Sequence, residues 1–360
     1  MLVTLYGNYN YGNILQRLSL SRIIESLGFT VQHLCLDDSL LPKTASKVII
    51  RFIKQTIKHI LALLGVKKYC MVPMFTKFQE QHIPSTKRIY TTFLQTLSAE
   101  PSEWAGYEYV ITGSDQVWNN WGNTQEELEF FYLSFIPKEK RVCYAPSFGF
   151  SEFPESDYEF HKKGLEGFDR LSCRELEMIP MIKSISGKDA QLVLDPTLLL
   201  DASQWREFAA KPDYDVPEKY VLCYFLGSKI PEYTSAIREA AGDLPVITIY
   251  DLCNAKYYLT DPGGFIWLID HADFVCTDSF HGAAFSVNFG KNFLVFRRIG
   301  LSGMFGRLSG LLDSLNITGH VYESGMKLRP EPVNYDDAAH KLETLRESSM
   351  NYLKDCLHVN

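Results

Sequence analysis

The sequence predicts an α/β protein built from two Rossmann-like parallel-sheet lobes that face each other across a cleft. Strand-like and helix-like segments alternate over 1–210 and again over 217–334. This repeated order of strand, helix and strand is typical of parallel sheets with helical connections. A stretch rich in Pro and Asp, 211–219, separates the two series and predicts a linker. The polar segment 335–360 predicts a C-terminal amphipathic helix.

The first lobe begins with a strand, a polar turn, a helix and a second strand. An apolar run over 1–6 predicts the strand, and the glycine-containing turn covers 7–13. Helical spacing of apolar residues over 14–28 and a β-like run over 29–36 complete a β–α–β unit. Ligands bind such units at the polar turn. The glycines of this turn lack the spacing of a dinucleotide-binding fingerprint.

The remaining elements follow the same alternation. The rest of the first lobe shows patterns of strands or helices at 107–113, 141–149, 156–169, 170–175 and 191–200, and of a helix around Trp205. The second lobe shows them at 220–227, 231–241, 245–250, 263–272, 273–277, 280–290 and 292–296. Both series therefore indicate the same architecture.

Composition limits the class of protein. The 360 residues are 46% hydrophobic, enough for substantial cores, and the formal net charge of −7 argues against a general nucleic-acid-binding protein. The eight cysteines lie far apart without a CxxC pair or zinc-ligand spacing, a pattern typical of reduced thiols in a cytoplasmic protein. We expect neither a signal peptide nor a transmembrane helix, because the apolar runs are too short.

One segment is basic in an otherwise acidic chain. From Ser39 to Gln79 there is no Asp or Glu, and the basic residues are Lys43, Lys47, Arg51, Lys54, Lys58, Lys67, Lys68 and Lys77. We interpret about 43–79 as an insertion in the first lobe. A helix over 47–64 would have a basic side and an isoleucine-rich side. Such a helix either lies in an anionic membrane surface, at the inner face of the membrane, or packs against the first lobe.

Polar side chains also follow predicted strands of the first lobe, where open α/β sheets bind ligands. Ser114 and Asp115 follow the run 107–113. Asp115 is placed to accept sugar hydroxyls, to act as a base, or to form an ordinary Asx turn. Arg174 ends another strand and either binds a ligand or pairs with Glu175 or a helix end.

In the second lobe, Asp278, Ser279 and His281 lie between a predicted strand and a predicted helix. The free amides of a helix N-terminus attract anions, but Asp or Ser also serves there as an N-cap without any ligand. Capping does not explain the histidine. Farther along, Arg297 and Arg298 alternate in direction if they extend a strand, so only one of them should face the cleft.

These residues form no Ser-His-Asp elbow, Walker loop or HExxH helix. Arg, His, Asp and polar amides from two lobes suit an anionic donor and a hydroxyl acceptor. Six blocks in this order also resemble the polysaccharide pyruvyl transferases, over roughly 7–310. The blocks are NYGNILQ, GSDQVWN, SFG, CRE, DPTLLL and ADFVCTDSFHGAAFSVNFGKNF.

The resemblance implies a GT-B-like fold and the transfer of a pyruvyl group from phosphoenolpyruvate to two hydroxyls of one sugar, with release of phosphate. It implies no metal and no cofactor beyond phosphoenolpyruvate as co-substrate. The acceptor would be a surface polysaccharide or its polyprenyl-linked precursor. The first lobe would bind this acceptor and the second lobe the donor.

The resemblance also implies roles for individual residues. Donor binding would involve Arg174, Ser279, His281, Gly282, Arg297 and Arg298. Acceptor binding would involve Asn8, Tyr11, Asn13, Ser114 and Asp115. His281 would hydrogen-bond or protonate the donor, since a histidine titrates near neutral pH.

The chain departs from the family pattern in three places. Ser279 stands where some branches have an Arg, and a Lys after the following strand is missing. Arg297, Arg298 or Arg307 would supply that charge. Asn13 stands where some relatives have an Asp, so we take Asp115 as the candidate base.

Two other functions fit the same pattern. A GT-B glycosyltransferase would use a nucleotide sugar, because one fold hosts several chemistries. A non-catalytic glycan-binding protein of the same fold is the other alternative. The presence of both Arg174 and His281 argues against the non-catalytic alternative, whereas Ser279 favours it.

Overall fold

The computed structural model describes residues 1–5, 10–36, 57, 67–83, 85–119, 125–150, 152–153, 155–250, 255–299 and 305–359. The candidate Asn8 lies outside these residues. So does most of the basic segment, in which only Ile57 is described before Lys67.

The N-terminal lobe contains a five-stranded sheet in the order β3–β2–β1–β4–β5, with every pair parallel. Leu2 of the central strand pairs with His33 on one side and Ile111 on the other. Such strands meet at their carboxyl ends, which places the following turns side by side. The strands are β1 (Leu2–Val3), β2 (His33–Leu36), β3 (Arg88–Thr91), β4 (Val110–Thr112) and β5 (Arg141–Cys143).

A separate parallel pair, β6 (Leu171–Cys173) and β7 (Ala190–Leu192), lies beside β5. Ser172 connects the two sheets, because its hydroxyl donates to the Cys143 carbonyl over 3.0 Å and accepts from the Ala145 amide over 3.2 Å. This contact brings Arg174, which follows β6, toward the turn that follows β4.

The C-terminal lobe contains a four-stranded parallel sheet in the order β11–β10–β8–β9. All four residues of β8 and of β10 are buried, as expected for a parallel sheet covered on both faces. The strands are β8 (Val221–Tyr224), β9 (Val246–Ile249), β10 (Phe274–Thr277) and β11 (Phe293–Val295).

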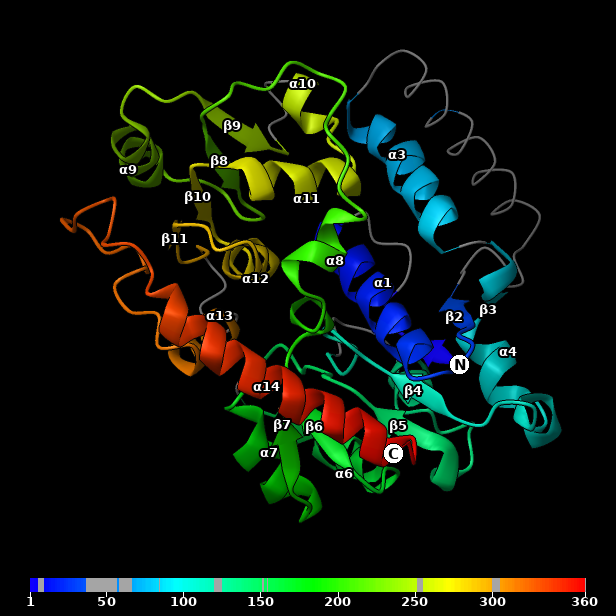
Figure 1. Cartoon of the computed structure of the whole chain (residues 1–360). Helices are drawn as coiled ribbons and strands as arrows, with labels where there is room; N and C mark the ends of the chain where they lie inside the picture. The colour runs from blue at the N-terminus through cyan, green and yellow to red at the C-terminus, as the bar shows by residue number, and fades with distance from the viewer. Residues whose placement is uncertain are drawn as a thin grey trace.

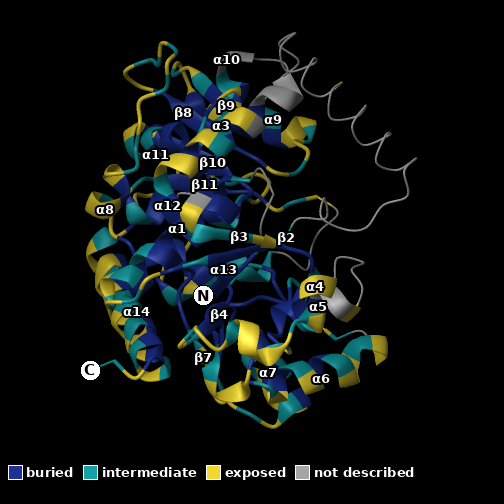
Figure 2. Cartoon of the chain, turned by 90° about the vertical axis from the view of Figure 1, so that its right-hand side faces the viewer, coloured by how far each residue is buried: buried dark blue, intermediate teal, exposed yellow. Residues whose placement is uncertain are grey.

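Helices surround both sheets, and in Figure 2 the exposed residues gather on their outer faces. Those of the N-terminal lobe are α1 (Tyr11–Ser26), α3 (Lys67–His82), α4 (Phe93–Ser98), α5 (Gln125–Phe131), α6 (Tyr158–Glu166), α7 (Met178–Ser186) and α8 (Ala202–Arg206). Those of the C-terminal lobe are α9 (Pro231–Ala241), α10 (Ala255–Tyr258), α11 (Pro262–His271), α12 (Phe280–Asn288) and α13 (Gly306–Ser314).

Two helices join the lobes (Figure 1). The first turn of α1 enters the C-terminal lobe, where Tyr11 stacks on Phe265 at 4.4 Å between ring centroids and donates to the Thr260 carbonyl over 2.7 Å. The last helix, α14 (Tyr335–Cys356), runs from one lobe to the other. Near its end Tyr352 donates to the Cys143 carbonyl over 3.0 Å. The lobes therefore share a continuous apolar core.

The predicted fold of two Rossmann-like, GT-B-like lobes is confirmed, whereas some element boundaries were wrong. Helix α1 begins at Tyr11, inside the predicted turn, because Asn10 is its N-cap and accepts from the amide of Gly12 over 2.9 Å. Six elements of the described residues were not predicted, namely β3, α4, α5, α7, α10 and α13, and α3 lies outside the helix predicted over 47–64. Of the predicted basic insertion, α3 is described, and its Phe75 packs on Tyr11 with 5.1 Å between centroids.

Candidate functional site

The turn between β10 and α12 gives each polar residue a separate contact. Ser279 is the N-cap of α12, and its hydroxyl accepts from the Gly282 amide over 3.4 Å. A Cβ at Gly282 would lie 2.2 Å from the hydroxyl oxygen of Thr277, so this position packs closely on the strand. Helix capping therefore explains the serine at 279, and close packing explains the glycine at 282, without any ligand.

Asp278 orders a neighbouring turn. Its carboxylate accepts from the amides of Leu226 and Gly227, after β8, over 2.7 and 2.8 Å. It also accepts from Nε of Arg298 over 3.3 Å. Arg298 is therefore held against the end of β10. The side chain of Arg297 is exposed, with its guanidinium 4.0 Å from the ring centroid of Phe305. The two arginines point to different surroundings, as their alternation predicts.

His281, in the first turn of α12, is the residue of this turn that faces the other lobe. It is 7% exposed, and a Cβ at Gly12 of α1 would lie 2.0 Å from its Nδ1. Its Nε2 lies 3.8 Å from an oxygen of Asp195 and makes no hydrogen bond within the described part of the chain. Burial lowers the pKa of His281, although Asp195 and Asp115 act in the opposite direction. The imidazole is therefore neutral at pH 7.

Arg174 lies at the centre of three carboxylates. Its guanidinium donates to Asp195 over 2.5 Å, to Asp115 over 3.2 Å and to Glu175 over 3.3 Å. The side chain is 2% exposed, and the ring of Phe280 lies 4.8 Å from its guanidinium carbon. Burial alone would lower the pKa of Arg174, but the carboxylates outweigh it and raise the pKa. Arg174 is therefore permanently charged and already neutralised by the protein.

Asp195 connects this arginine to the histidine. It accepts from the Thr197 amide and hydroxyl over 3.0 and 2.7 Å and from the Ser114 hydroxyl over 3.4 Å. Burial alone would raise the pKa of Asp195, yet His281 and Arg174 hold it below its usual value. A buried, hydrogen-bonded carboxylate at this position fixes the relative placement of Arg174 and His281.

Arg307, on α13, approaches the same carboxylates from the C-terminal lobe. Its Nη1 lies 4.0 Å from Asp115, and with the Gln116 amide turned so that its oxygen faces Arg307, both Nη atoms donate to it over 2.6 and 2.7 Å. Burial lowers the pKa of Arg307, and the nearby charge of Arg174 lowers it further. Burial raises the pKa of Glu175, while Arg174 and Arg307 partly oppose this rise.

The acceptor-side candidates do not form one group. Tyr11 is fully buried in the core between the lobes, and Ser114 is buried with its hydroxyl donating to the Ala145 carbonyl over 3.1 Å. Asn13 is buried, and its side-chain amide makes no hydrogen bond to the described residues. The Asp115 side chain is 18% exposed. Among these four, Asp115 has the side chain that lies next to Arg174 and Arg307.

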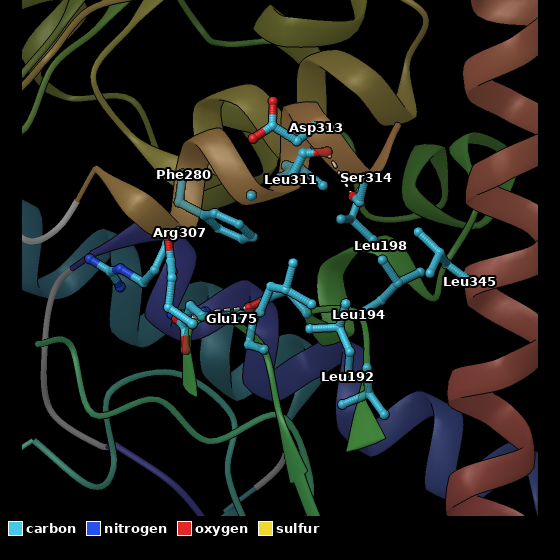
Figure 3. A pocket seen from close by; sticks show the side chains of 16 residues that line it. Glu175, Leu192, Leu194, Leu198, Phe280, Arg307, Leu311, Asp313, Ser314 and Leu345 are labelled. Atoms are coloured by element: carbon cyan, nitrogen blue, oxygen red, sulfur yellow. Dashed lines mark hydrogen bonds and ion pairs between the residues drawn. The ribbon is translucent and has the colours of Figure 1, made fainter. Parts of the chain in front are cut away.

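A pocket of about 310 Å³ lies beside this cluster, with Arg307 at one end and Leu345 of α14 at the other (Figure 3). Leucines provide much of its wall, while Arg174, Glu175 and Asp195 contribute polar groups. A second space of about 20 Å³, lined by Asp278, Phe280, Arg298, Phe305, Arg307 and Leu308, has room for about one water molecule. Arg307 and Phe280 line both spaces.

The sequence interpretation missed the central roles of Asp195 and Arg307. Asp195 stands in the quoted block DPTLLL but was given no role of its own, and in the structure it caps a short helix at Pro196–Leu198. Arg307 was one of three interchangeable arginines in a glycine-rich stretch without a helical pattern. Only the packing of α13 shows which of the three reaches Asp115.

The polysaccharide pyruvyl transferase family model matches residues 10–298. The chain belongs to this family. The match includes the turns that carry Asp115, Arg174, Asp195 and His281, whereas Arg307 lies beyond it. No curated protein matches the chain.

Two solved structures align with nearly the whole chain. A putative UDP-N-acetylglucosamine 2-epimerase from Listeria monocytogenes aligns with TM-score 0.50 and 11% identity, over 98% of this chain and 89% of that one. The HepE protein of Anabaena, solved with UDP and glucose, aligns with TM-score 0.46 and 10% identity, over 98% and 99% of the two chains. At such identities the likeness concerns the fold and not the substrate.

Three further properties concern the described residues alone. No helix there is long and apolar enough to cross a membrane. No group of at least three His, Cys, Asp or Glu side chains is arranged to hold a metal ion. Where the structure describes cysteine side chains, at Cys35, Cys143, Cys173, Cys223, Cys276 and Cys356, the thiols are free, and all but that of Cys356 are buried.

Proposed function

We propose that this family member transfers a pyruvyl group from phosphoenolpyruvate to two hydroxyls of one sugar, forming a cyclic ketal. The sugar belongs to a surface polysaccharide or to its lipid-linked precursor. The observation that carries the proposal is that His281, Arg174 and Asp195 lie together between the lobes. An oxygen of Asp195 lies 3.8 Å from Nε2 of His281 and 2.5 Å from Nη1 of Arg174. Family membership supplies the reaction class.

The reaction balances without an oxidant or reductant. One sugar hydroxyl attacks C2 of phosphoenolpyruvate while C3 takes up a proton and becomes a methyl group, and the bond from C2 to the phosphate oxygen breaks. The second hydroxyl then closes the ring. The two sugar hydroxyls lose two protons in total. C3 gains one proton, and the released phosphate carries away the other. The protein must therefore deliver one proton and accept another.

His281 is the residue we propose for proton delivery. Burial keeps it neutral in the free protein, so it must first gain a proton. An anion bound within about 4–6 Å favours the charged form of a histidine and raises its pKa. Phosphoenolpyruvate would therefore create the acid that its own conversion needs. Asp115, the partly exposed carboxylate beside Arg174, is our candidate to accept the hydroxyl proton.

The direct test is incubation with phosphoenolpyruvate and a model glycoside. We expect phosphate release in proportion to ketal formed, measured by a phosphate assay and by mass spectrometry of the glycoside. Activity should persist in EDTA; a loss that a divalent ion restores would overturn the metal-free part of the proposal. Binding of a UDP- or CMP-sugar without any binding of phosphoenolpyruvate would favour a glycosyltransferase. Binding of glycan without turnover would favour the non-catalytic alternative.

We also propose that the protein works in the cytoplasm, at the inner face of the membrane, beside a polyprenyl-linked acceptor. The support is the basic segment 39–79, whose residues up to 66 lie outside the described part except Ile57. Each basic residue near an anionic surface contributes about 1 kcal/mol, less at high salt. Liposome co-sedimentation should therefore require anionic lipid and decline in the Lys54→Glu/Lys58→Glu variant. Binding that ignores lipid charge would instead indicate a helix packed on the first lobe.

A further inference from the structure

The arginines of the site differ in how much of their charge the protein neutralises. Three carboxylates lie within 2.5 to 3.3 Å of Arg174, and Asp278 lies 3.3 Å from Arg298. For Arg307 the nearest carboxylate oxygen is 4.0 Å away, on Asp115, and the same oxygen lies closer to Arg174, at 3.2 Å. Among Arg174, Arg298 and Arg307, Arg307 is therefore the one without a carboxylate oxygen of the described residues at hydrogen-bonding distance.

The hydrogen bonds of Arg307 are also incomplete. Its two Nη atoms share one neutral acceptor, the Gln116 amide, and its buried Nε makes no hydrogen bond to the described residues. The side chain is only 14% exposed. A buried charge without a close counterion is unfavourable, because protein polar groups replace its hydration incompletely. An anionic ligand that completes these contacts recovers that cost.

Arg307 is also more exposed than Arg174, with 14% against 2% of the side chain accessible, and unlike Arg174 it lines two spaces. It lines both the pocket of about 310 Å³ and the small space beside Asp278 and Arg298. It comes from the C-terminal lobe and faces Asp115 and Gln116 of the N-terminal lobe, so an anion on it would contact both lobes. The planar guanidinium suits the oxygens of a phosphate or a carboxylate.

We infer that Arg307, and not Arg174, is the residue that binds an oxyanion of the ligand in this cleft. This inference rests on the proposed function for the identity of the ligand, the phosphate or carboxylate of phosphoenolpyruvate. Arg174 then acts as a positioning residue that holds Asp195 and Asp115. Arg307 lies outside residues 10–298, the part that matches the family model, so this assignment comes from the geometry of this chain.

The test measures binding of phosphoenolpyruvate, inorganic phosphate and UDP by calorimetry to the wild type, Arg307→Gln and Arg307→Lys. Loss of hydrogen bonds to a charged group should weaken phosphoenolpyruvate binding about 10- to 100-fold in Arg307→Gln. Arg307→Lys should lie between the two, because it keeps the charge and loses the planar donor pair. The matched control is Arg170→Gln, which breaks an exposed pair with Asp355 and should bind like the wild type.

Each outcome separates the two proposals. Wild-type affinity for phosphoenolpyruvate in Arg307→Gln overturns the inference and leaves the proposed function intact. If the wild type binds UDP but not phosphoenolpyruvate, and the affinity for UDP depends on Arg307, the oxyanion site stands and the proposed function fails. A wild type that binds none of the three probes overturns both. If thermal unfolding shows that Arg307→Gln is not folded, Arg307→Lys decides, and unchanged affinity there overturns the inference.

Discussion

Two buried histidines, His161 on α6 and His281 on α12, show what distinguishes a structural from a functional environment in this protein. His161 is fully buried, and its Nδ1 lies 2.6 Å from the Tyr132 hydroxyl. Its other neighbours are aromatic rings with centroids between 5.1 and 6.0 Å away, those of Phe148, Phe150, Phe153 and Phe160. Burial lowers its pKa to about 4.

His281 is nearly as buried, and burial lowers its pKa too, but its neighbours are ionised. Asp195 and Asp115 act to raise that pKa, whereas Arg174 and Arg307 act to lower it. The aromatic rings around His161 carry no charge, and one carboxylate, Asp157, acts to raise its pKa against the larger effect of burial. The charges around His281 can be rebalanced by one bound anion. Burial therefore does not indicate function by itself; the chargeable neighbours do.

The largest expected effect is on turnover. His281→Asn should lower kcat about 10²–10⁴-fold, the usual contribution of general acid–base catalysis and about 3–5 kcal/mol of barrier. His161→Asn should leave kcat near the wild-type value and lower the midpoint of urea unfolding, because it disturbs an apolar core. The measurements are steady-state phosphate release and urea titration of both variants. Similar loss of turnover in both would show that the two environments do not differ as we infer.

A second large effect concerns the carboxylate beside His281. Asp195→Asn removes the negative charge closest to the buried Arg174, and breaking a buried ion pair costs about 3–5 kcal/mol of unfolding free energy. We expect the lower end of that range, because Asp115 and Glu175 remain beside Arg174. The control Asp355→Asn breaks an exposed pair and should cost less than about 1 kcal/mol. Equal costs in urea titrations would contradict the central position of Asp195.

The same comparison shows which features of the structure the sequence predicts. Alternating apolar runs predicted both sheets, because the burial of parallel strands leaves a local pattern. The turn with Asp278, Ser279 and His281 was found because strand, polar turn and helix follow one another directly in the chain. In each case the signal lies within a few neighbouring residues.

Charge balance, in contrast, depends on distant parts of the chain. Arg174 and Asp195 lie 21 residues apart, and Arg174 and Asp115 lie 59 apart. No local sequence pattern shows that three carboxylates surround Arg174, or that Arg307 has no carboxylate oxygen closer than 4.0 Å among the described residues. The sequence also did not distinguish His161 from a surface histidine, because its aromatic neighbours come from 148–153 and from α6 together.

The pH dependence of stability sharpens the comparison further. The folded-state pKa of His161, about 4, lies below the unfolded value of 6.5, so folding favours the neutral ring. The contribution of His161 is therefore fully present above pH 6.5 and is lost as the pH falls from 6.5 toward 4. The loss amounts to at most about 3 kcal/mol.

The matched variant is His161→Gln, which does not titrate and still offers Tyr132 a hydrogen-bond partner. Urea titrations between pH 4 and 7 should show a smaller decline with acid in this variant than in the wild type. His281 and His33, whose pKa values burial also lowers, contribute to the decline in both proteins, so the difference between them reports on His161. Parallel curves would show that His161 does not titrate abnormally.

The smallest expected effects come from two glycines that each lie against one of these sites. A Cβ at Gly12 would lie 2.0 Å from Nδ1 of His281, and a Cβ at Gly164 would lie 2.5 Å from the ring of Tyr132, the partner of His161. Alanine at either position overpacks its surroundings, at a cost of about 1–3 kcal/mol in unfolding free energy.

Only Gly12→Ala should also lower kcat, by up to about 10²-fold, because it displaces His281 from its place beside Asp195. Gly164→Ala should shift the unfolding midpoint at unchanged kcat. If Gly12→Ala is destabilised to the same extent but turns over normally, the placement of His281 against α1 does not matter for the reaction, and His281 belongs with His161 among the structural residues.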